Sequence, residues 1–435
     1  MTSVKRIAVI GAGIAGNGAA WALHHGSDHE ITVFEREPRA GGHSATVDID
    51  YDGRAIAVDT GFIVFNELNY PNLTRLFAHL GVETFESDMT FSVSDESGRV
   101  AWSSRPQDYL GGLFPGSARL PSPVHLQVLG DLVRFNRAGV ADLHAGRLRG
   151  LTLGEYLERG GFSRRFREDY LIAMGSAIWS MPPGSVLDFP AEAFLSFFEN
   201  HRLLRMSQPT WRTVAGGSRT YVEALTRGFA DRLHLGSPVK RVIPGEGAAR
   251  VVLENGAVQD FDAVVLACHS DQALALLGEE AGPRAQMLAS ISYRANPVYL
   301  HSDAGLMPQR KSAWAAWNVI KRNDQDVSVS YWMNALQGID PACPLFVTLN
   351  PSRPPAPEHT FARFDYAHPQ FDRAALAAQG RLPALQGRDG IWFCGAWTGY
   401  GFHEDGLLSG LNVAEALGAQ IPWRLTPRQF QAAAE

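Results

Sequence analysis

The spacing of hydrophobic residues in the first thirty-six positions changes twice, from a strand pattern to a helical pattern and back. Residues 5–10 form a short apolar run of strand length, and residues 31–34 form a second one. Between them, residues 17–25 have helical spacing, with the apolar side supplied by Ala19, Ala20, Ala22 and Leu23. A strand period that gives way to a helical period and then returns predicts strand, helix and strand in succession, as in an α/β fold.

The rest of the chain divides into helical and alternating stretches. Helical spacing is present at residues 69–83, 126–133, 170–179, 193–204, 221–230 and 407–418. Alternating or continuously apolar stretches are present at residues 90–103, 250–266, 298–301, 327–332 and 391–394, with Asn255-Gly256 as a hairpin turn in the second of these. From about residue 106 to 205, helices separated by Gly and Pro predict an insertion that covers the substrate. Its aromatic residues either form core, which we favour for most of them, or line an apolar tunnel: Trp179, Phe189, Phe194, Phe197 and Phe198.

Three glycines follow the first predicted strand as G-x-G-x-x-G: Gly11, Gly13 and Gly16. Such glycines allow a tight turn, close approach of the backbone to a pyrophosphate, and close packing of helix on strand. The helix start offers free N–H groups to phosphate, and Glu35, which ends the second strand, is placed to accept hydrogen bonds from a ribose. The alternative is a glycine-rich loop without a ligand, but the strand–helix context favours dinucleotide binding.

Composition and charge narrow the classes of function. The 435 residues are 45% hydrophobic and 19% charged, enough for two or three domains with packed cores. A net charge of −6 without a basic block argues against a nucleic-acid partner. The three cysteines lie far apart, so neither a disulfide framework nor a metal site is expected. With no signal peptide and no apolar run of about 20 residues, we expect a soluble, cytoplasmic protein.

Beyond Glu35 the sequence resembles the flavin-dependent amine oxidase and phytoene-desaturase superfamily. Members carry an Arg-x-Gly-Gly-Arg-like segment after the acidic ribose ligand; here Arg39, Gly41 and Gly42 match, and His43 stands in place of the second arginine. The resemblance implies FAD as cofactor. It also implies a D-x-G segment beside the flavin ring (Thr60, Gly61) and a valine at the adenine (Val239).

The end of the chain resembles the same superfamily. Residues 391–410 read as an apolar strand that closes on Gly395, followed by a helix whose first N–H groups would face the flavin N1–O2 edge. Together with the motif residues, the implied FAD contacts are Gly11, Gly13, Ala15, Gly16, Glu35, Arg36, Gly42, His43, Thr60, Gly61, Val239, Gly395, Asp405 and Leu407.

We predict that the domains interleave. A Rossmann-like FAD-binding domain is expected to combine residues 1–85, 206–285 and 385–420. An α+β substrate domain, which carries the helical insertion, would comprise residues 86–205 and 286–384, and residues 421–435 would be a tail.

The predicted function is that of an FAD-dependent oxidoreductase. Since only one dinucleotide motif is present, the substrate itself is expected to reduce the flavin at N5, with oxygen or a quinone as the electron acceptor. Amine oxidases of the superfamily carry a lysine in a strand of the substrate sheet, and the comparable residues 293–300 contain none. We therefore favour desaturation of an apolar, fatty-acyl or lipid-like small molecule, with peripheral membrane contact left open. The alternatives are an amine oxidase, a non-redox flavin-dependent isomerase and a nicotinamide-binding protein.

His403 is the candidate general base, with a pKa near working pH, and Tyr400 is expected to shape the pocket. Glu404 and Asp405 are alternatively only caps of the last helix. His301 with Asp303 is a second acid–base candidate, for which a solvated strand end is the favoured interpretation.

Overall fold

A five-stranded parallel sheet forms the core of one half of the molecule, in the order β10-β2-β1-β14-β20. The computed structural model describes residues 4–104, 123–204, 209–322 and 326–424. The strands of this sheet are β1 (Arg6–Ile10), β2 (Glu30–Phe34), β10 (Leu233–His234), β14 (Ala263–Leu266) and β20 (Ile391–Phe393). All four residues of β14 are buried, as is typical of a parallel strand covered on both faces.

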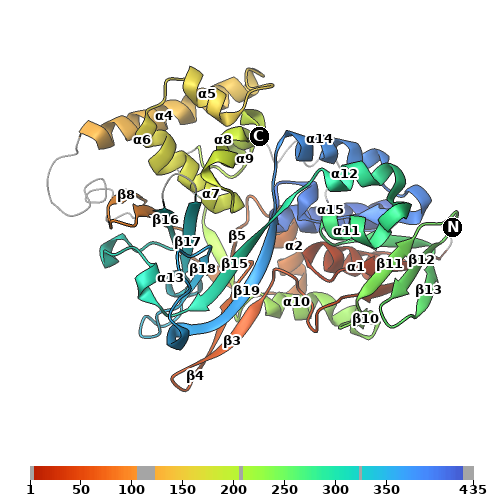
Figure 1. The fold of residues 1–435 in the computed structure, drawn as a ribbon. Coiled ribbons are helices and arrows are strands. Elements are labelled where there is room, and N and C mark those ends of the chain that lie inside the picture. Colours follow the sequence, from red (N-terminus) through yellow and green to blue (C-terminus); the bar gives the residue numbers. More distant parts are fainter. Residues whose placement is uncertain (1–3, 105–122, 205–208, 323–325, 425–435) are drawn as a thin grey trace.

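Helices and a small sheet cover the two faces of the parallel sheet (Figure 1). One apolar core joins it to α1 (Ile14–Gly26), α2 (Pro71–Leu80), α10 (Arg219–Thr226) and α15 (His403–Ala416). A second core joins it to α11 (Ser270–Leu277), α12 (Ala285–Ala289), α14 (Arg373–Arg381) and the antiparallel strands β11 (Val239–Ile243), β12 (Ala249–Leu253) and β13 (Val258–Phe261). The predicted hairpin at Asn255-Gly256 is confirmed as the β12–β13 connection.

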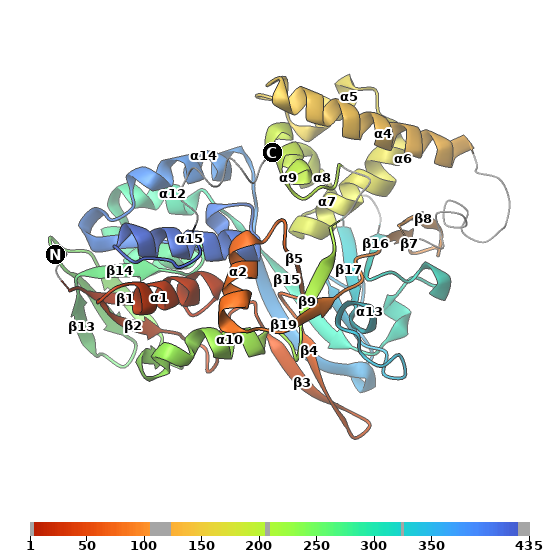
Figure 2. The ribbon, with the colours of Figure 1, turned by 180° about the vertical axis from the view of Figure 1, so that it is seen from behind.

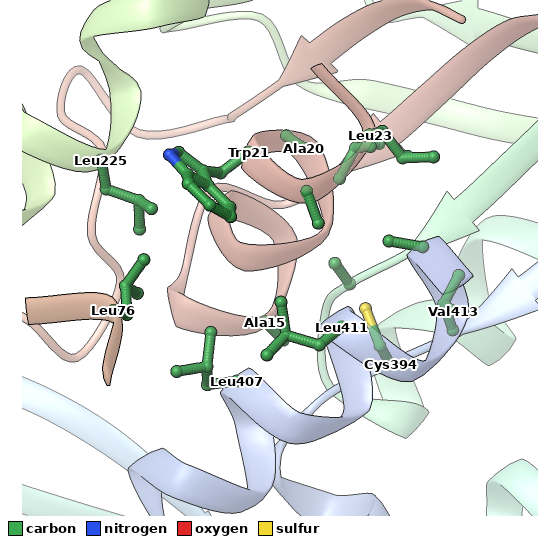
Figure 3. Packing of buried hydrophobic residues seen from close by; sticks show 14 of the residues in the cluster. Ala15, Ala20, Trp21, Leu23, Leu76, Leu225, Cys394, Leu407, Leu411 and Val413 are labelled. Carbon is green, nitrogen blue, oxygen red and sulfur yellow. The ribbon is translucent and has the colours of Figure 1, made fainter. Parts of the chain in front are cut away.

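Helices α1 and α15 pack against each other through small residues. A Cβ on Gly410 would lie 2.1 Å from the carbonyl oxygen of Ala15, and one on Gly18 would lie 2.7 Å from Leu407 Cδ1. Figure 3 shows Leu407, Ala15 and their neighbours filling the contact between the two helices. The first and last helices of the cofactor half are therefore fixed to one another without space for larger side chains.

A seven-stranded mixed sheet forms the second half, in the order β19-β15-β18-β17-β16-β7-β8. Its strands are β7 (Phe91–Asp95), β8 (Val100–Ser103), β15 (Tyr293–His301), β16 (Trp317–Arg322), β17 (Asp326–Trp332), β18 (Phe346–Leu349) and β19 (Thr360–Pro369). Among the described strands of this sheet, only β16 and β7 pair in parallel. The long pair β15–β19 runs through the middle of the molecule in both views (Figures 1 and 2), and α13 (Met333–Gln337) follows β17.

A group of helices lies beside this sheet (Figure 1). It comprises α4 (Pro123–His144), α5 (Leu153–Arg159), α6 (Arg164–Phe166), α7 (Ile172–Trp179), α8 (Pro183–Asp188) and α9 (Ala191–Asn200). The aromatic residues that could have lined a tunnel are core, each at most 4% exposed: Trp179, Phe189, Phe194, Phe197 and Phe198. Among the described residues, no helix is both long and apolar enough to span a bilayer.

Short strands connect the two halves. They are the hairpin β3 (Thr46–Tyr51) and β4 (Arg54–Asp59), and the small sheet of β5 (Val64–Asn66), β9 (Trp211–Val214) and β6 (Thr84–Glu86).

The predicted α/β class with a parallel sheet is confirmed. The parallel sheet takes strands from three separate parts of the sequence, which supports the interleaved domains; their boundaries stay a prediction. Parts of that prediction fall at residues 1–3, 105–122, 205–208, 323–325 and 425–435, outside the described residues.

Candidate active site

The turn between β1 and α1 is shaped by glycine. Gly11 has φ of +104°, and a Cβ there would lie 2.7 Å from the carbonyl oxygen of Ala267. A Cβ on Gly16 would lie 1.9 Å from the carbonyl oxygen of Gly11, whereas one on Gly13 would meet open space. Gly13 precedes α1 without a side-chain cap, so the first N–H groups of the helix, including that of Ala15, lack a capping side chain. This geometry fits a pyrophosphate.

The buried carboxylate of Glu35 binds the glycine turn and is also the predicted ligand of the ribose. Its Oε2 accepts from the N–H of Ala12 at 2.7 Å and its Oε1 from the N–H of Glu37 at 3.0 Å, so it already holds the glycine turn. A carboxylate has about four acceptor positions, and Glu35 therefore keeps capacity for ribose hydroxyls. The side chain of Arg36, by contrast, is exposed and pairs with Glu37 at 3.1 Å.

The segment that leads into β11 lies beside Glu35. The N–H of Glu35 donates to the carbonyl of His234 at 2.9 Å, and the N–H of Ser237 donates to the carbonyl of Glu35 at 2.8 Å. Val239, two residues further, is half-buried at the start of β11. The predicted ribose and adenine contacts are therefore brought together although about 200 residues separate them.

The second glycine segment folds back onto the first. The N–H of Gly41 donates to the carbonyl of Ala12 at 2.7 Å, and Gly13 and Gly41 form an isolated parallel bridge. A Cβ on Gly42 would lie 3.1 Å from Gly13 Cα. Positive φ values of +114° at Gly41 and +58° at Gly42 make this return possible.

His43 and the Thr60-Gly61 segment are adjacent. A Cβ on Gly61 would lie 2.1 Å from the carbonyl oxygen of His43. The Thr60 hydroxyl donates to the carbonyl of Ala45 at 3.1 Å and hydrogen-bonds the Tyr366 hydroxyl at 2.8 Å. Nε2 of His43 is buried without a hydrogen-bond partner in the described protein. A buried nitrogen without a hydrogen-bond partner lowers the stability of the fold unless a ligand supplies the bond. The unpaired Nε2 of His43 is therefore consistent with a cofactor bound beside it.

Three histidines gather at this place. The ring of His43 lies 5.5 Å from that of His368 and 6.3 Å from that of His269, and 5.0 Å from the ring of Tyr366. Burial, then the neighbouring His368 and His269, lowers the pKa of His43 to about 3. Burial and His269 lower the pKa of His368 to about 4, and burial also lowers that of His269. All three rings are thus neutral at pH 7.

The start of α15 is fixed by its own carboxylate. Asp405 accepts from the N–H groups of Tyr400 and Phe402, each at 3.0 Å, and burial raises the pKa of Asp405 to about 6. Its side chain therefore caps the helix. The side chain of Leu407 is fully buried, so any contact of these two residues with flavin would come from the backbone. Gly395, whose φ is +154°, lies between β20 and the short 3-10 turn at Ala396–Thr398 that precedes α15.

Glu404 joins α15 to α2. Its Oε1 accepts from the backbone N–H of Asn72 at 2.9 Å and from Nδ2 of that residue at 2.7 Å, and its Oε2 accepts from the N–H of Leu73 at 3.0 Å. The carboxylate thus caps the neighbouring helix, a role that no local sequence pattern indicates.

His403 lies in a hydrogen-bonded chain. Its Nε2 lies 2.6 Å from the Tyr221 hydroxyl, which in turn contacts the Ser44 hydroxyl. Its ring stacks on Phe62 at 3.9 Å. Burial lowers the pKa of His403 to about 3, so the prediction of a pKa near working pH is wrong. The ring is neutral at pH 7 and able to accept a proton, but it is a weaker base than expected.

Aromatic side chains from the helical group reach the turn before α15. Phe197 stacks on Phe402 at 4.7 Å and lies 6.1 Å from Tyr400, and His201 stacks on Phe197 at 3.8 Å. Tyr400 therefore lies at the junction between the turn and the apolar core of the helices.

His301 and Asp303 form a structural pair. His301 is fully buried, its Nε2 is 2.7 Å from the Thr348 hydroxyl, and its Nδ1 accepts from the N–H of Asp303 at 3.1 Å. Asp303 pairs with Arg353 at 2.8 Å. The solvated strand end favoured from the sequence is therefore wrong.

Sequence reasoning missed the groups on β15 and β19 that face the histidines. Asn296 on β15 is buried and hydrogen-bonds His368 on β19, and Tyr366 precedes His368 on the same face of that strand. The alternation along β19 could have predicted that Tyr366 and His368 share a face. The pairing of β15 with β19, some 70 residues apart in the chain, could not be predicted from the sequence.

Comparison with known proteins gives the family and the fold of the chain. A model of the family described as flavin-containing amine oxidoreductase matches residues 14–299. A search of curated protein sequences gives no match.

Similar solved structures share the fold at low sequence identity. A putrescine oxidase variant and the cyclohexylamine oxidase of Brevibacterium oxydans IH-35A each superpose with a TM-score of 0.69 at 16% identity, over 95% of this chain and 98% and 99% of theirs. A conjugated-linoleic-acid-producing fatty acid isomerase from P. acnes has a TM-score of 0.68 at 16% identity, over 95% of this chain and 99% of its own.

Proposed function

The chain belongs to the family of flavin-containing amine oxidoreductases, and on this premise we propose that it dehydrogenates an apolar, fatty-acyl or lipid-like substrate. Membership makes it an FAD-dependent oxidoreductase. The substrate class, the residue roles and the electron acceptor, oxygen or a quinone, belong to the proposal, as does peripheral contact with the membrane that would supply such a substrate.

The FAD site is assigned to the backbone-rich turns. The first turn of α1 would bind the pyrophosphate, Glu35 the ribose, the start of β11 the adenine, and the loops at residues 41–43 and 60–61 the flavin ring. The N-terminus of α15 would face the edge of the ring where charge builds up. The residues proposed for FAD are Gly11, Gly13, Ala15, Gly16, Glu35, Arg36, Gly42, His43, Thr60, Gly61, Val239, Gly395, Asp405 and Leu407.

FAD, when bound, supplies a two-electron acceptor that takes a hydride at N5. In the proposed reaction one carbon of the substrate loses that hydride and its neighbour loses a proton, so that a single bond becomes a double bond. His403 would take the proton. Since its Nε2 is bonded to Tyr221, the proton would go to Nδ1, with Nε2–H donating to Tyr221 and the Tyr221 hydroxyl donating to Ser44.

The observation that carries the substrate class is that the side chains in contact with His403, Phe62 and Tyr221, are uncharged. The turn residues Tyr400 and Phe402, just before His403 in the chain, pack on Phe197 of the helical core. The two carboxylates at this end of α15, Glu404 and Asp405, both accept backbone N–H groups and serve as caps. A buried ammonium would need a counter-charge, and these uncharged contacts support an apolar substrate instead.

The lysines support the same view. None lies on β15, and Lys321 on β16 donates to Asp169 of the helical group at 2.8 Å. Burial alone would raise the pKa of Asp169, but the bonds and charges of Lys321, Arg165 and Arg99 lower it, so the lysine is held in an ion pair.

Anaerobic reduction of the flavin tests the proposal. The purified protein should be yellow with one FAD per chain, and fatty acids or phospholipids should bleach it, whereas primary amines, polyamines and amino acids should not. His403→Gln should leave FAD binding near normal and slow the bleaching by about 10²–10⁴-fold, as for a lost acid–base group.

Two results would contradict different parts of the proposal. Rapid bleaching by an amine would overturn the substrate class. Bleaching by acyl chains at an undiminished rate in the His403 variant would leave the class in place and exclude His403 as the base. His359→Gln, at an exposed histidine outside the site, is the matched control.

A further inference from the structure

Asn296 on β15 and His368 on β19 are hydrogen-bonded, and the partners of Asn296 fix which of their nitrogen atoms carry hydrogen. Asn296 is fully buried, and its Nδ2 lies 3.0 Å from the carbonyl oxygen of Arg294 and 3.1 Å from Nδ1 of His368. A backbone carbonyl can only accept, so the atom facing it must be the amide nitrogen. The Oδ1 of Asn296 accepts from Nδ2 of Asn350 at 2.8 Å, which fits the same orientation.

The orientation of this amide determines the tautomer of the imidazole. Because Nδ2 of Asn296 donates to Nδ1 of His368, that ring nitrogen must carry a lone pair. A neutral imidazole has one N–H and one lone pair, so the proton of His368 lies on Nε2. His368 is thereby fixed as a hydrogen-bond donor at Nε2 and is unsuited to act as a base there.

The surroundings place this donor next to the residues assigned to the flavin. Tyr366, two residues before His368 on the same strand face, hydrogen-bonds Thr60 at 2.8 Å. The ring of His43 lies 5.0 Å from Tyr366 and 5.5 Å from His368, and its Nε2 has no partner in the described protein. The end of the β15–β19 pair therefore meets the loops at residues 41–43 and 60–61.

We propose that His368 donates a hydrogen bond from Nε2 to the reaction centre, and that Asn296 is the positioning residue that fixes this tautomer. The ligand is an oxygen or nitrogen acceptor, either on the flavin ring or on the substrate bound over it. The inference rests on the proposed function in taking these loops to flank the flavin; it does not depend on whether the substrate is an acyl chain or an amine.

Nitrogen NMR tests the tautomer directly. In FAD-loaded protein labelled with ¹⁵N-histidine, His368 should show a protonated Nε2 and an unprotonated Nδ1 at pH 7, with its signals identified by their loss in His368→Gln. In Asn296→Asp a carboxylate would accept from Nδ1–H, so the proton should move to Nδ1. A wild-type His368 protonated at Nδ1 would overturn the proposal, and this measurement requires no destabilising variant.

The flavin spectrum distinguishes the two acceptors. If the acceptor is on the flavin, His368→Phe should shift the visible absorption of the oxidised, substrate-free protein; if it is on the substrate, the shift should arise only when substrate or product is added. His368→Gln, whose amide can still donate, should stay closer to wild type, and His359→Phe should change nothing. Identical spectra of His368→Phe and wild type in both states would overturn the proposal. Failure of acyl chains to bleach the flavin would count against the proposed function alone.

Discussion

The two sides of the candidate site are built in different ways. On the cofactor side, position is set by backbone: a Cβ at Gly11, Gly16 or Gly61 would come within 2.7 Å of a carbonyl oxygen. Where the substrate is proposed to react, position is set by side chains from both halves of the molecule, as in the bond of Asn296 to His368 and the chain of His403, Tyr221 and Ser44. The cofactor site therefore requires glycines that leave space for close backbone contacts. The proposed reaction site requires neutral rings held by side-chain hydrogen bonds.

The largest effect should come from adding one methyl group on the cofactor side. Gly16→Ala would bring Cβ to 1.9 Å from the carbonyl oxygen of Gly11, and no rotamer can relieve a clash between backbone atoms. We expect a loss of at least about 3 kcal/mol in the free energy of unfolding, measured by urea denaturation.

Gly13→Ala is the matched control. Its Cβ would meet no protein atom within 4 Å, so stability without FAD should fall by about 1 kcal/mol or less, the range for a changed N-cap. Affinity for FAD should drop, because the methyl group stands where the backbone is proposed to approach the pyrophosphate. Equal losses of stability in Gly16→Ala and Gly13→Ala would contradict the claim that Gly16 is required by the backbone contact.

The second effect concerns the neutral rings and is a dependence on pH. Burial lowers the pKa of His43 and His403 to about 3, and that of His201, His301 and His368 to about 4. Since these values lie below the unfolded value of 6.5, the unfolded chain binds more protons between about pH 4 and 6.5. Stability should therefore fall on acidification below pH 6.5, by up to about 1.4 kcal/mol per pH unit and histidine.

The carboxyls of Asp59, Glu404 and Asp405 oppose this trend, because burial raises the pKa of each. The raised pKa of Asp405, about 6, makes its contribution fall as pH rises from about 4 to 6. The net effect of the five histidines against these three carboxyls should still be acid lability, measured as the free energy of unfolding at pH 7 and pH 5. His201→Phe removes one of these histidines and should reduce the slope of unfolding free energy against pH by up to about 1.4 kcal/mol per pH unit. A stability that does not change between these pH values would refute the assignment of neutral rings.

A smaller effect should follow from Glu404, which joins α15 to α2. Glu404→Gln keeps the shape but loses one of the acceptor oxygens that bind the N–H groups of Asn72 and Leu73. A loss of about 1–3 kcal/mol in unfolding free energy is expected, the cost of an unpaired buried group. Glu358→Gln, at an exposed position, should have no effect, and an equal loss there would remove the special role of Glu404.

The last effect is on FAD affinity and not on stability, and it concerns the cofactor side alone. Glu35→Ala should weaken FAD binding by roughly 1.5–3 kcal/mol for each charge-assisted hydrogen bond lost, as measured by titrating FAD into the cofactor-free protein. Glu37→Ala removes an exposed neighbouring carboxylate and should leave the affinity unchanged. If the two variants retain FAD equally, Glu35 acts only on the glycine turn.

The same contrast explains what could be predicted from the sequence. The glycine turn, Glu35 and the last helix carry local patterns, because a tight backbone turn demands glycine at fixed spacing. Asn296 and His368 carry none, because their meeting depends on the register of β15 against β19. His403 was found by its place before a helix, but its low pKa follows from burial against Phe62, which no local pattern shows. The cap that Glu404 provides for α2, 331 positions away in the chain, was equally hidden.

The ribosome makes the glycine turn and α1 long before it makes α15, the helix that packs on α1. Because α1 packs on α15, and β20 completes the edge of the parallel sheet, the nascent chain keeps the apolar face of α1 without its partner until residues beyond 391 have emerged. At about 5–20 residues per second, that interval lasts some tens of seconds. Chaperones therefore have a defined period in which to shield this face, and a message truncated before β20 would yield a chain unable to close its first domain.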